Sequence, residues 1–367
     1  MSIKLTIGTA VYNVGEAFLR MHIEGIIKQL TDETELLLID DCSTDNSGEV
    51  CKEYSEKDSR IRYIRMDKNS GLSSVRNRTI DEAKGKWIFF SDGDDMLSDY
   101  SVETALRFSD SDYDIIIHNR GDFVDEKPSE ASCTVKELKL LPYFAGRDIS
   151  ISCLSIKPFD YNKYNMDKTA FFHAAWSALY RRDFLIKNEL LFPVGQKKAQ
   201  DSVFNTYTYF AASKIAYLPY SMYYYRKNAA GITKRYSADF VQMAQSLIAH
   251  HTDCIKNLYP DDEDVKKAYS KYRLMSLTLD SMKLNFFHRD NPNTTKIRKR
   301  DFIEFVNTEP FKTAISEYEI AKDGWWGWNL LILYIKKKNF IMLNFAIRHE
   351  KAFRFYGKLW STFHKSF

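Results

Sequence analysis

One stretch, residues 87–95, constrains the fold of this chain more than any other. Residues 87–90 are large and apolar, and the run ends abruptly in Asp92, Asp94 and Asp95 around a glycine. This pattern predicts a buried strand that carries acidic side chains at its carboxyl end. Ligands bind at that edge of an open α/β sheet, so chemistry is expected there. A solvated acidic turn is the alternative interpretation, because Asp and Gly also favour turns.

Strands and helices alternate through the first hundred residues. Apolar runs at 3–9, 35–39 and 61–64 predict three further strands, each followed by a segment with helical character. Such alternation implies right-handed crossovers and a mostly parallel sheet. Tyr12 and Asp41 follow the first two strands, so we expect them at the same edge as the acids.

The acidic cluster also indicates a ligand class. Carboxylates this close repel one another unless a cation lies among them. Hard oxygen ligands suit Mg²⁺ or Mn²⁺, which also bind phosphate oxygens. The sequence therefore predicts a Mn²⁺ or Mg²⁺ site and a phosphate-bearing ligand.

Seven motifs within residues 3–235 together resemble the family 2 glycosyltransferases, which use nucleotide sugars and have the GT-A fold. The motifs lie at residues 12–13, 39–45, 71–77, 92–95, 176–181, 200–204 and 223–226. Each motif alone is weak, but their order and spacing are specific. The resemblance implies an α/β GT-A domain over 1–235, with a mostly parallel sheet flanked by helices. Nucleotide-sugar binding is expected at about 1–120 and the acceptor side at about 121–235.

The resemblance implies roles for several residues on the donor side. The expected nucleotide-sugar-binding residues are Thr9, Tyr12, Asp41, Arg76, Asp92 and Gly93, and Asp94 is the expected metal ligand. Tyr12 would lie against uracil, and Asp41 would accept a hydrogen bond from the pyrimidine N–H. Tyr12 as a packing aromatic, Asp41 as a helix cap and Arg76 as a surface arginine are the open alternatives. Asp95 would bind metal or brace the loop.

Asp201 is the expected catalytic base. Transfer with inversion needs one carboxylate to take the proton of the attacking acceptor hydroxyl. Family members carry a Glu-Asp pair where this chain has Gln200 and Asp201. Gln200 and Trp176 are expected on the acceptor side. An acidic residue in the first turn of a helix is the structural alternative for Asp201.

The remainder, residues 236–367, has helical character. Apolar residues recur at three- and four-residue steps from Phe240 to Leu258, which predicts one amphipathic helix. From Gly324 to the end, eight basic residues accompany a single acid, Glu350, so this tail carries a net charge of +7 in a chain of net charge +4. Three tryptophans precede the lysines.

The tail and the rest of the composition bear on location. A basic, aromatic-rich tail suits contact with an anionic membrane surface; its packing against the catalytic domain is the alternative. A nucleic-acid partner is not expected, because no recognition module accompanies the charge. Five cysteines without paired metal-ligand spacing indicate reduced thiols. We expect a cytoplasmic protein at the inner face of the membrane.

The sequence thus predicts an inverting, metal-dependent hexosyl- or N-acetylhexosaminyltransferase. It would move a sugar from a UDP-sugar to a glycan or lipid-linked glycan acceptor in surface polysaccharide synthesis. A sugar nucleotidyltransferase is one alternative, but it would carry a glycine-rich phosphate loop after the first strand, which residues 9–13 lack. A non-catalytic glycan-binding or scaffold protein of the same fold is the other alternative.

Overall fold

The computed structural model describes residues 2–124, 135–143, 145–227, 235–319 and 326–349. The chain divides into two compact units. Unit 1 comprises Met1–Leu154, Pro158–Ala229 and His250–Pro260, and unit 2 comprises Ser155–Lys157, Ala230–Ala249 and Asp261–Phe367. Helix α8 (Phe240–Leu258) has residues in both units and matches the amphipathic helix predicted there. The predicted domain boundary after residue 235 remains a prediction.

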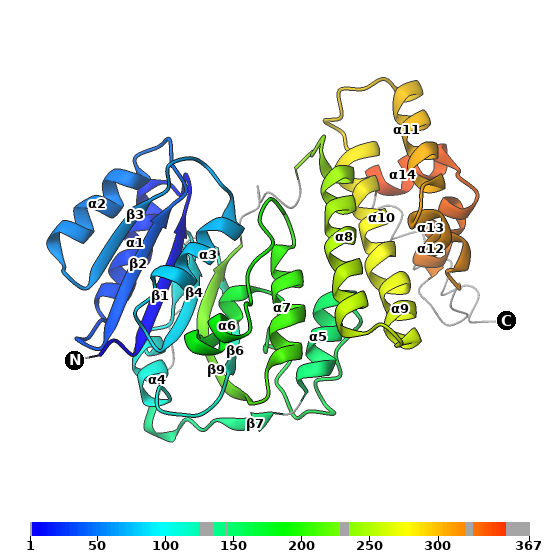
Figure 1. Ribbon diagram of the computed structural model, residues 1–367. Helices are drawn as coiled ribbons and strands as arrows, with labels where there is room; N and C mark the ends of the chain where they lie inside the picture. The colour runs from blue at the N-terminus through cyan, green and yellow to red at the C-terminus, as the bar shows by residue number, and fades with distance from the viewer. Residues whose placement is uncertain (1, 125–134, 144, 228–234, 320–325, 350–367) are drawn as a thin grey trace, which may run out of the picture. The chain divides into compact units, whose positions relative to one another are not determined.

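The described residues of unit 1 form a nine-stranded sheet (Figure 1). Its strands are β1 (Leu5–Val11), β2 (Thr34–Asp40), β3 (Ile61–Arg65), β4 (Trp87–Asp92), β5 (Met96–Leu97), β6 (Ile115–Phe123), β7 (Leu141–Tyr143), β8 (Ala178–Arg181) and β9 (Ile215–Arg226). The order is β3-β2-β1-β4-β8-β6-β9-β5, and β7 also pairs with β9. The predicted α/β architecture is confirmed.

The two halves of the sheet differ in strand direction. Strands β1 to β4 are parallel, as their alternation with helices predicted. Strand β8 is antiparallel to both β4 and β6, whereas β6 and β9 are parallel. The carboxyl ends of β1, β2 and β4 therefore share one edge, and residues at the carboxyl end of β9 contact the loop that follows β4.

Strand side chains alternate between the two faces of the sheet, and helices pack against both faces. Leu36, Leu38 and Phe89 pack with α1 (Glu16–Ile27), α2 (Ser47–Lys57) and α4 (Ser101–Arg107). Ile88 and Phe90 pack on the opposite face. The helices that contribute there are α3 (Leu72–Glu82), α5 (Gly146–Ser155), α6 (Arg182–Lys187) and α7 (Gln200–Ala211). Apolar burial on both faces explains why the strands are nearly continuous hydrophobic runs.

The described part of unit 2 is helical, which confirms a helical C-terminal region. Its helices are α9 (Glu263–Ala268), α10 (Met275–Ser281), α11 (Thr295–Asn307), α12 (Phe311–Glu317), α13 (Trp326–Lys336) and α14 (Phe340–Arg348), with π-helical stretches at 269–274 and 282–286. Phe287 packs its ring against Phe302 and Phe340, at centroid distances of 5.4 and 5.0 Å. Residues 324–325 and 350–367 of the predicted basic tail, Trp325 among them, lie outside the described residues.

The described residues contain no helix that combines the length and the apolar character needed to cross a bilayer. Four of the five cysteines are described, and these four form no disulfide with one another: Cys42, Cys51, Cys153 and Cys254. The reduced state of the thiols remains a prediction.

Close packing between β1 and α3 requires a glycine at position 8. A Cβ built on Gly8 would lie 2.2 Å from Cγ2 of the buried Thr79. Because Thr79 is β-branched and enclosed, it has little freedom to move away. The close approach of α3 to β1 therefore depends on the absence of a side chain at position 8.

We expect Gly8→Ala to lower the free energy of unfolding by about 1–3 kcal/mol, because the added methyl overpacks this contact. Gly25→Ala is the matched control. Gly25 lies within α1, and its Cβ would meet nothing within 4 Å. The control should therefore gain about 0.5–1 kcal/mol from helix propensity. Urea unfolding measures both, and equal effects of the two substitutions would contradict the packing argument.

Candidate functional site

The loop after β4 holds its three carboxylates in different environments. The side chains of Asp92 and Asp94 are 26% and 42% exposed, whereas Asp95 is buried. The Gly93 N–H donates to the Ala10 carbonyl oxygen at 3.1 Å, which ties the loop to the end of β1. A Cβ on Gly93 would lie 3.1 Å from the Val14 side chain, so this close approach favours glycine. The loop can thus present two acids outward while the third faces the protein.

Asp95 braces the loop against β9. Its Oδ2 accepts from the Tyr223 hydroxyl at 2.7 Å, and its Oδ1 accepts from the Arg226 N–H at 2.8 Å. The Tyr223 hydroxyl in turn accepts from the Asp92 N–H at 3.1 Å. Burial, with the nearby charges of Asp92 and Asp94, raises the pKa of Asp95 well above its ordinary value. Of the two roles left open for Asp95, this geometry fits the bracing role.

Arg226 was not among the site residues predicted from the sequence. Its Nη2 lies 2.7 Å from Asp94 Oδ2, and its Nε donates to the Asp94 carbonyl oxygen at 3.1 Å. The guanidinium carbon lies 3.9 Å from the centre of the Phe18 ring, which covers it. The signal for Arg226 in the sequence was its place at the end of the 223–226 motif, directly after three tyrosines.

Arg76 joins two carboxylates that are far apart in the sequence. Its Nη2 lies 3.1 Å from Asp92 Oδ1, and its Nη1 donates to Asp201 Oδ1 in the first turn of α7. The Arg76 side chain is only 3% exposed. Burial disfavours its charge, but the carboxylates of Asp201 and Asp92 raise its pKa above the ordinary value. The structure therefore gives Arg76 a buried bridging position, unlike the surface arginine that was its alternative.

The charges of this cluster do not balance. Asp92, Asp94 and Asp201 face the two guanidinium groups of Arg76 and Arg226. Burial, opposed by Arg76 and supported by the charges of Asp201 and Asp94, raises the pKa of Asp92. Even with Asp95 protonated, these charged groups retain a net negative charge. Such a site favours an additional cation.

A divalent cation fits this donor set in one particular way. Among the described residues no group of three or more His, Cys, Asp or Glu side chains is arranged to hold a metal. Mg²⁺ and similar ions, however, are commonly held by one or two carboxylates together with substrate phosphates and water. Asp94, the most exposed of the three acids, and Asp92 supply hard oxygens of that kind. The residues present fit a metal shared with a phosphate ligand.

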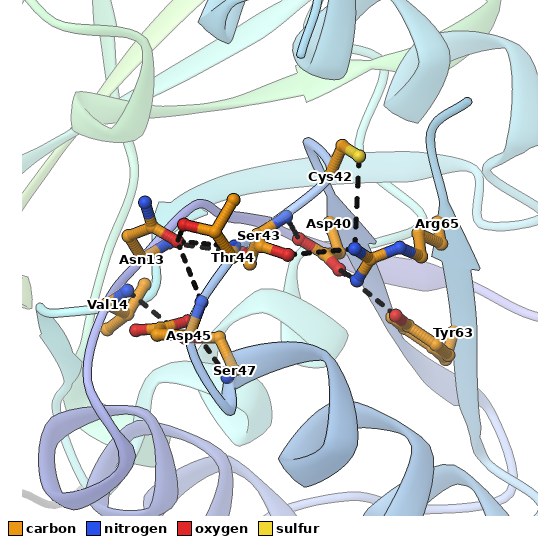
Figure 2. A network of polar contacts seen from close by, with 10 residues as sticks. All are labelled: Asn13, Val14, Asp40, Cys42, Ser43, Thr44, Asp45, Ser47, Tyr63 and Arg65. Carbon is orange, nitrogen blue, oxygen red and sulfur yellow. Dashed lines mark hydrogen bonds and ion pairs between the residues drawn. The ribbon is translucent and has the colours of Figure 1, made fainter. Parts of the chain in front are cut away.

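The loops after β1 and β2 are locked together, as Figure 2 shows. The Asn13 side-chain oxygen accepts from the Thr44 and Asp45 N–H groups at 2.8 and 3.3 Å. The buried Asp40 carboxylate accepts from the Ser43 N–H at 2.8 Å and pairs with Arg65 at 2.6 Å. Asn13 tolerates the left-handed φ of 49° that this arrangement requires. The loops form a rigid edge beside the acids.

Tyr12 and Asp41 lie on this edge. Tyr12 is 49% exposed, so its ring is available to a ligand. The Asp41 carboxylate is buried and accepts from the N–H groups of Ser70 and Gly71 at 2.7 and 2.8 Å. Asp41 thereby fixes the chain just before α3. Each carboxylate oxygen has a second lone pair, so these bonds leave room for a ligand N–H.

Thr9 belongs to a buried hydrogen-bonded chain beneath the site. Its hydroxyl contacts Ser91 Oγ at 2.8 Å and His22 Nε2 at 3.0 Å, and His22 Nδ1 lies 2.7 Å from the Asp95 carbonyl oxygen. Because a carbonyl only accepts, Nδ1 carries the proton, and Nε2 accepts from Thr9. The Thr9 side chain therefore supports the acidic loop from below. Thr9 as a nucleotide-sugar contact remains a prediction.

The two residues predicted on the acceptor side are both buried. Gln200 is 7% exposed at the start of α7, one residue before Asp201. Trp176 is 5% exposed and stacks on Tyr223, with ring centroids 4.6 Å apart and planes 4° apart. Neither residue presents a large surface to a ligand.

This chain is similar in sequence to known glycosyltransferases. The model of glycosyl transferase family 2 matches residues 6–188, about half of the chain. Glycosyltransferase GlyG of Streptococcus pneumoniae is 26% identical over 264 residues, 70% of this chain and 82% of GlyG. Glycosyltransferase GlyA of the same organism is 30% identical over 274 residues, 74% of this chain but only 37% of GlyA. This chain therefore spans little more than a third of GlyA.

Among solved structures, residues 1–349 of TarS from S. aureus share the fold. The TarS complex with UDP-GlcNAc superposes with a TM-score of 0.61 at 17% sequence identity, covering 95% of this chain and 92% of that one. Structural similarity at this low sequence identity shows a shared fold and nothing more specific.

The buried chain through His22 predicts a pH dependence of stability. Burial lowers the pKa of His22 from 6.5 to about 4, against the raising effects of the Asp95 carbonyl and the Asp94 charge. The unfolded chain therefore binds a proton near pH 6.5, whereas the folded protein does so only near pH 4. This contribution to stability is complete above pH 6.5 and is lost as pH falls toward 4.

We expect His22→Gln to remove this loss, which amounts to roughly 3 kcal/mol. Urea unfolding of both proteins between about pH 7 and pH 4.5 measures it. The wild-type curve should fall more steeply than that of the variant, and parallel curves would contradict a neutral buried His22.

Proposed function

This chain belongs to glycosyl transferase family 2, and we propose that it transfers a sugar with inversion from a UDP-sugar to a glycan acceptor in bacterial surface glycan synthesis. The single observation that carries the proposal is the Arg76 bridge. One guanidinium group pairs with both Asp92, which ends β4, and Asp201, in the first turn of α7. An acidic donor edge and a separate carboxylate are the two parts that an inverting transfer needs.

Donor binding falls to the rigid edge. The exposed ring of Tyr12 would stack on the base, and Asp41, fixed by Ser70 and Gly71, would accept from the pyrimidine N–H. Both residues are held by short loops that other hydrogen bonds already order. UDP is the nucleotide we propose, and the UDP-GlcNAc bound to TarS makes an N-acetylhexosamine the first donor to test.

Asp201 is the proposed general base. Arg76 holds its Oδ1, which orients the carboxylate and leaves Oδ2 as the oxygen that takes the acceptor proton. Asp201 is 20% exposed, so an acceptor hydroxyl can reach it. Gln200 replaces a second acid beside this base without adding a charge.

Asp92 and Asp94 would hold Mn²⁺ or Mg²⁺. A bound cation of this kind supplies electrostatic stabilisation for the charge that develops on a diphosphate leaving group. The leaving group then needs no proton, so a single carboxylate base is sufficient. Arg226 restrains the orientation of Asp94, and Asp95 restrains the loop that carries both acids.

We expect two conservative substitutions to separate binding from catalysis. Asp201→Asn should lower the rate at which the enzyme produces UDP from a UDP-sugar by about 10²–10⁴-fold, because the variant cannot accept the acceptor proton. Its UDP affinity with Mn²⁺ should change little, since Arg76 keeps Asp92 as an ion-pair partner. Asp94→Asn should weaken Mn²⁺-dependent UDP binding itself. Calorimetry and a UDP-release assay over a panel of UDP-sugars measure the two effects.

Asp81→Asn is the matched control, because Asp81 is exposed and lies on the same helix as Arg76. It should match the wild type in both assays. Full turnover by Asp201→Asn would rule out the assigned base.

Membrane contact remains part of the proposal. Helix α14 buries Phe340, Leu343 and Ala346 but exposes Ile341 and Phe345, which are 78% and 45% exposed and lie one turn apart. Lysines 336–338 lie two to four residues before the start of this helix. An exposed apolar pair beside basic residues is typical of shallow insertion into an anionic surface. The same membrane would carry a lipid-linked acceptor.

We expect the double substitution Ile341→Ser/Phe345→Ser to weaken binding to phosphatidylglycerol vesicles by about tenfold or more, because it removes the inserted apolar area. Vesicle sedimentation at low salt measures this. Val194→Ser is the control, since Val194 is 65% exposed but belongs to unit 1. Wild-type protein that does not bind these vesicles would contradict the proposal.

A further inference from the structure

An aromatic stack beside the acidic loop has one member open to solvent. Trp176 stacks on Tyr223 at 4.6 Å and on Tyr225 at 5.7 Å, with interplanar angles of 4° and 18°. Trp176 and Tyr223 are buried, whereas Tyr225 is 38% exposed. Trp176 covers the Tyr225 ring on one side, so the exposed area belongs to the rest of that ring. Among these three rings only Tyr225 can meet a ligand.

Strand β9 places Tyr225 next to the candidate donor site. Tyr223 and Tyr225 share one face of the strand, and the Tyr223 hydroxyl binds Asp95. The following residue, Arg226, pairs with Asp94. Burial raises the pKa of Tyr225, and the charges of Asp95, Asp94 and Asp92 raise it further, which reflects how near this phenol lies to the acids.

Polar groups flank the exposed ring. Strand β6 pairs with β9 so that Asp122 is opposite Tyr225 and Arg120 is opposite Tyr223. The Arg120 guanidinium carbon lies 5.9 Å from the centre of the Tyr225 ring, and its Nε lies 3.7 Å from Asp122 Oδ1. Both side chains remain about 30% exposed. Asp122 Oδ1 is itself buried and makes no hydrogen bond within the described part of the chain, whereas Asp122 Oδ2 pairs with Lys227 Nζ at 2.7 Å at the surface.

This combination matches the chemistry of a sugar ring. A pyranose has an apolar face of C–H groups that packs on an aromatic ring, and a rim of hydroxyls that needs charged or polar partners. A flat ring offers this contact at low conformational cost. Tyr225 provides the flat surface, Trp176 fixes its orientation, and Arg120 and Asp122 provide polar groups at its edge.

We propose that Tyr225, supported by Trp176 and flanked by Arg120 and Asp122, is a saccharide-binding platform that takes a pyranose ring of the acceptor glycan. The inference rests on the proposed function, since an acceptor sugar has to lie close to the donor site. Trp176, which was predicted on the acceptor side, then acts as a positioning residue behind Tyr225. Sugar contact falls to the exposed tyrosine.

The test uses a panel of methyl hexopyranosides as probes, in the presence of UDP and the diamagnetic ion Mg²⁺, with the full chain. Binding is measured by saturation-transfer NMR titration. We expect wild type to bind at least one probe, Tyr225→Phe to retain that affinity within about twofold, and Tyr225→Ala to weaken it by about 5–10-fold, the loss of one aromatic stacking contact. Tyr225→Leu still covers Trp176, so it provides the same test if the alanine variant fails to fold. It should weaken probe binding by a similar factor.

Phe210→Ala is the matched control, because Phe210 is an aromatic residue of similar exposure, 41%, on α7. It should leave probe binding unchanged. Equal affinity in wild type, Tyr225→Ala and Tyr225→Leu would overturn the platform, as would a wild type that binds no probe. UDP affinity measured on the same samples separates the two proposals: a protein that binds sugars through Tyr225 but never binds UDP refutes the donor assignment and leaves the platform standing.

Discussion

The buried guanidinium of Arg76 is the interaction on which the rest of the site depends. Asp92 and Asp201 are far apart in the sequence of unit 1, and without a cation between them their charges would repel across a partly desolvated space. Arg76 is itself set by helix α3, whose start is fixed by the Asp41 carboxylate. One ion-pair bridge thus links the rigid edge formed by the loops after β1 and β2 to the first turn of α7. Each terminal nitrogen of Arg76 binds a different carboxylate, so directed hydrogen bonds as well as charge attraction stabilise the bridge.

Much of the fold followed from local patterns. Apolar runs predicted strands β1 to β4, because side-chain burial on both faces leaves a clear signature, and the acids that end β2 and β4 indicated the edge where the strands meet. The mixed direction of β6, β8 and β9 left no comparable pattern. Their pairing depends on which distant segments meet, and strand direction is not encoded in any short window. The predicted helix from Phe240 to Leu258 was recovered because amphipathic periodicity is itself local.

The site shows the same division between local and distant information. The acids were predictable from spacing, but their partners were not. Arg226 pairs with Asp94 across 132 residues, and Arg76 meets Asp201 across 125. Nor could three consecutive tyrosines reveal which ring is exposed, because that depends on Trp176 and the register of β9. Thr9 is another example: its hydroxyl belongs to a buried chain through His22, a partner that no local pattern indicated.

The interlocked loops around Asn13 and Asp40 have a consequence for molecular recognition. A flexible loop that folds around its ligand loses conformational freedom at the expense of affinity, whereas this edge is already ordered by its own hydrogen bonds. A ligand that bound at this edge would therefore associate without a slow rearrangement of the loops. The same stiffness makes the edge intolerant of ligands of another shape, since it cannot mould itself to them. Selectivity then comes from preorganisation, and it is encoded in residues that need never touch the ligand.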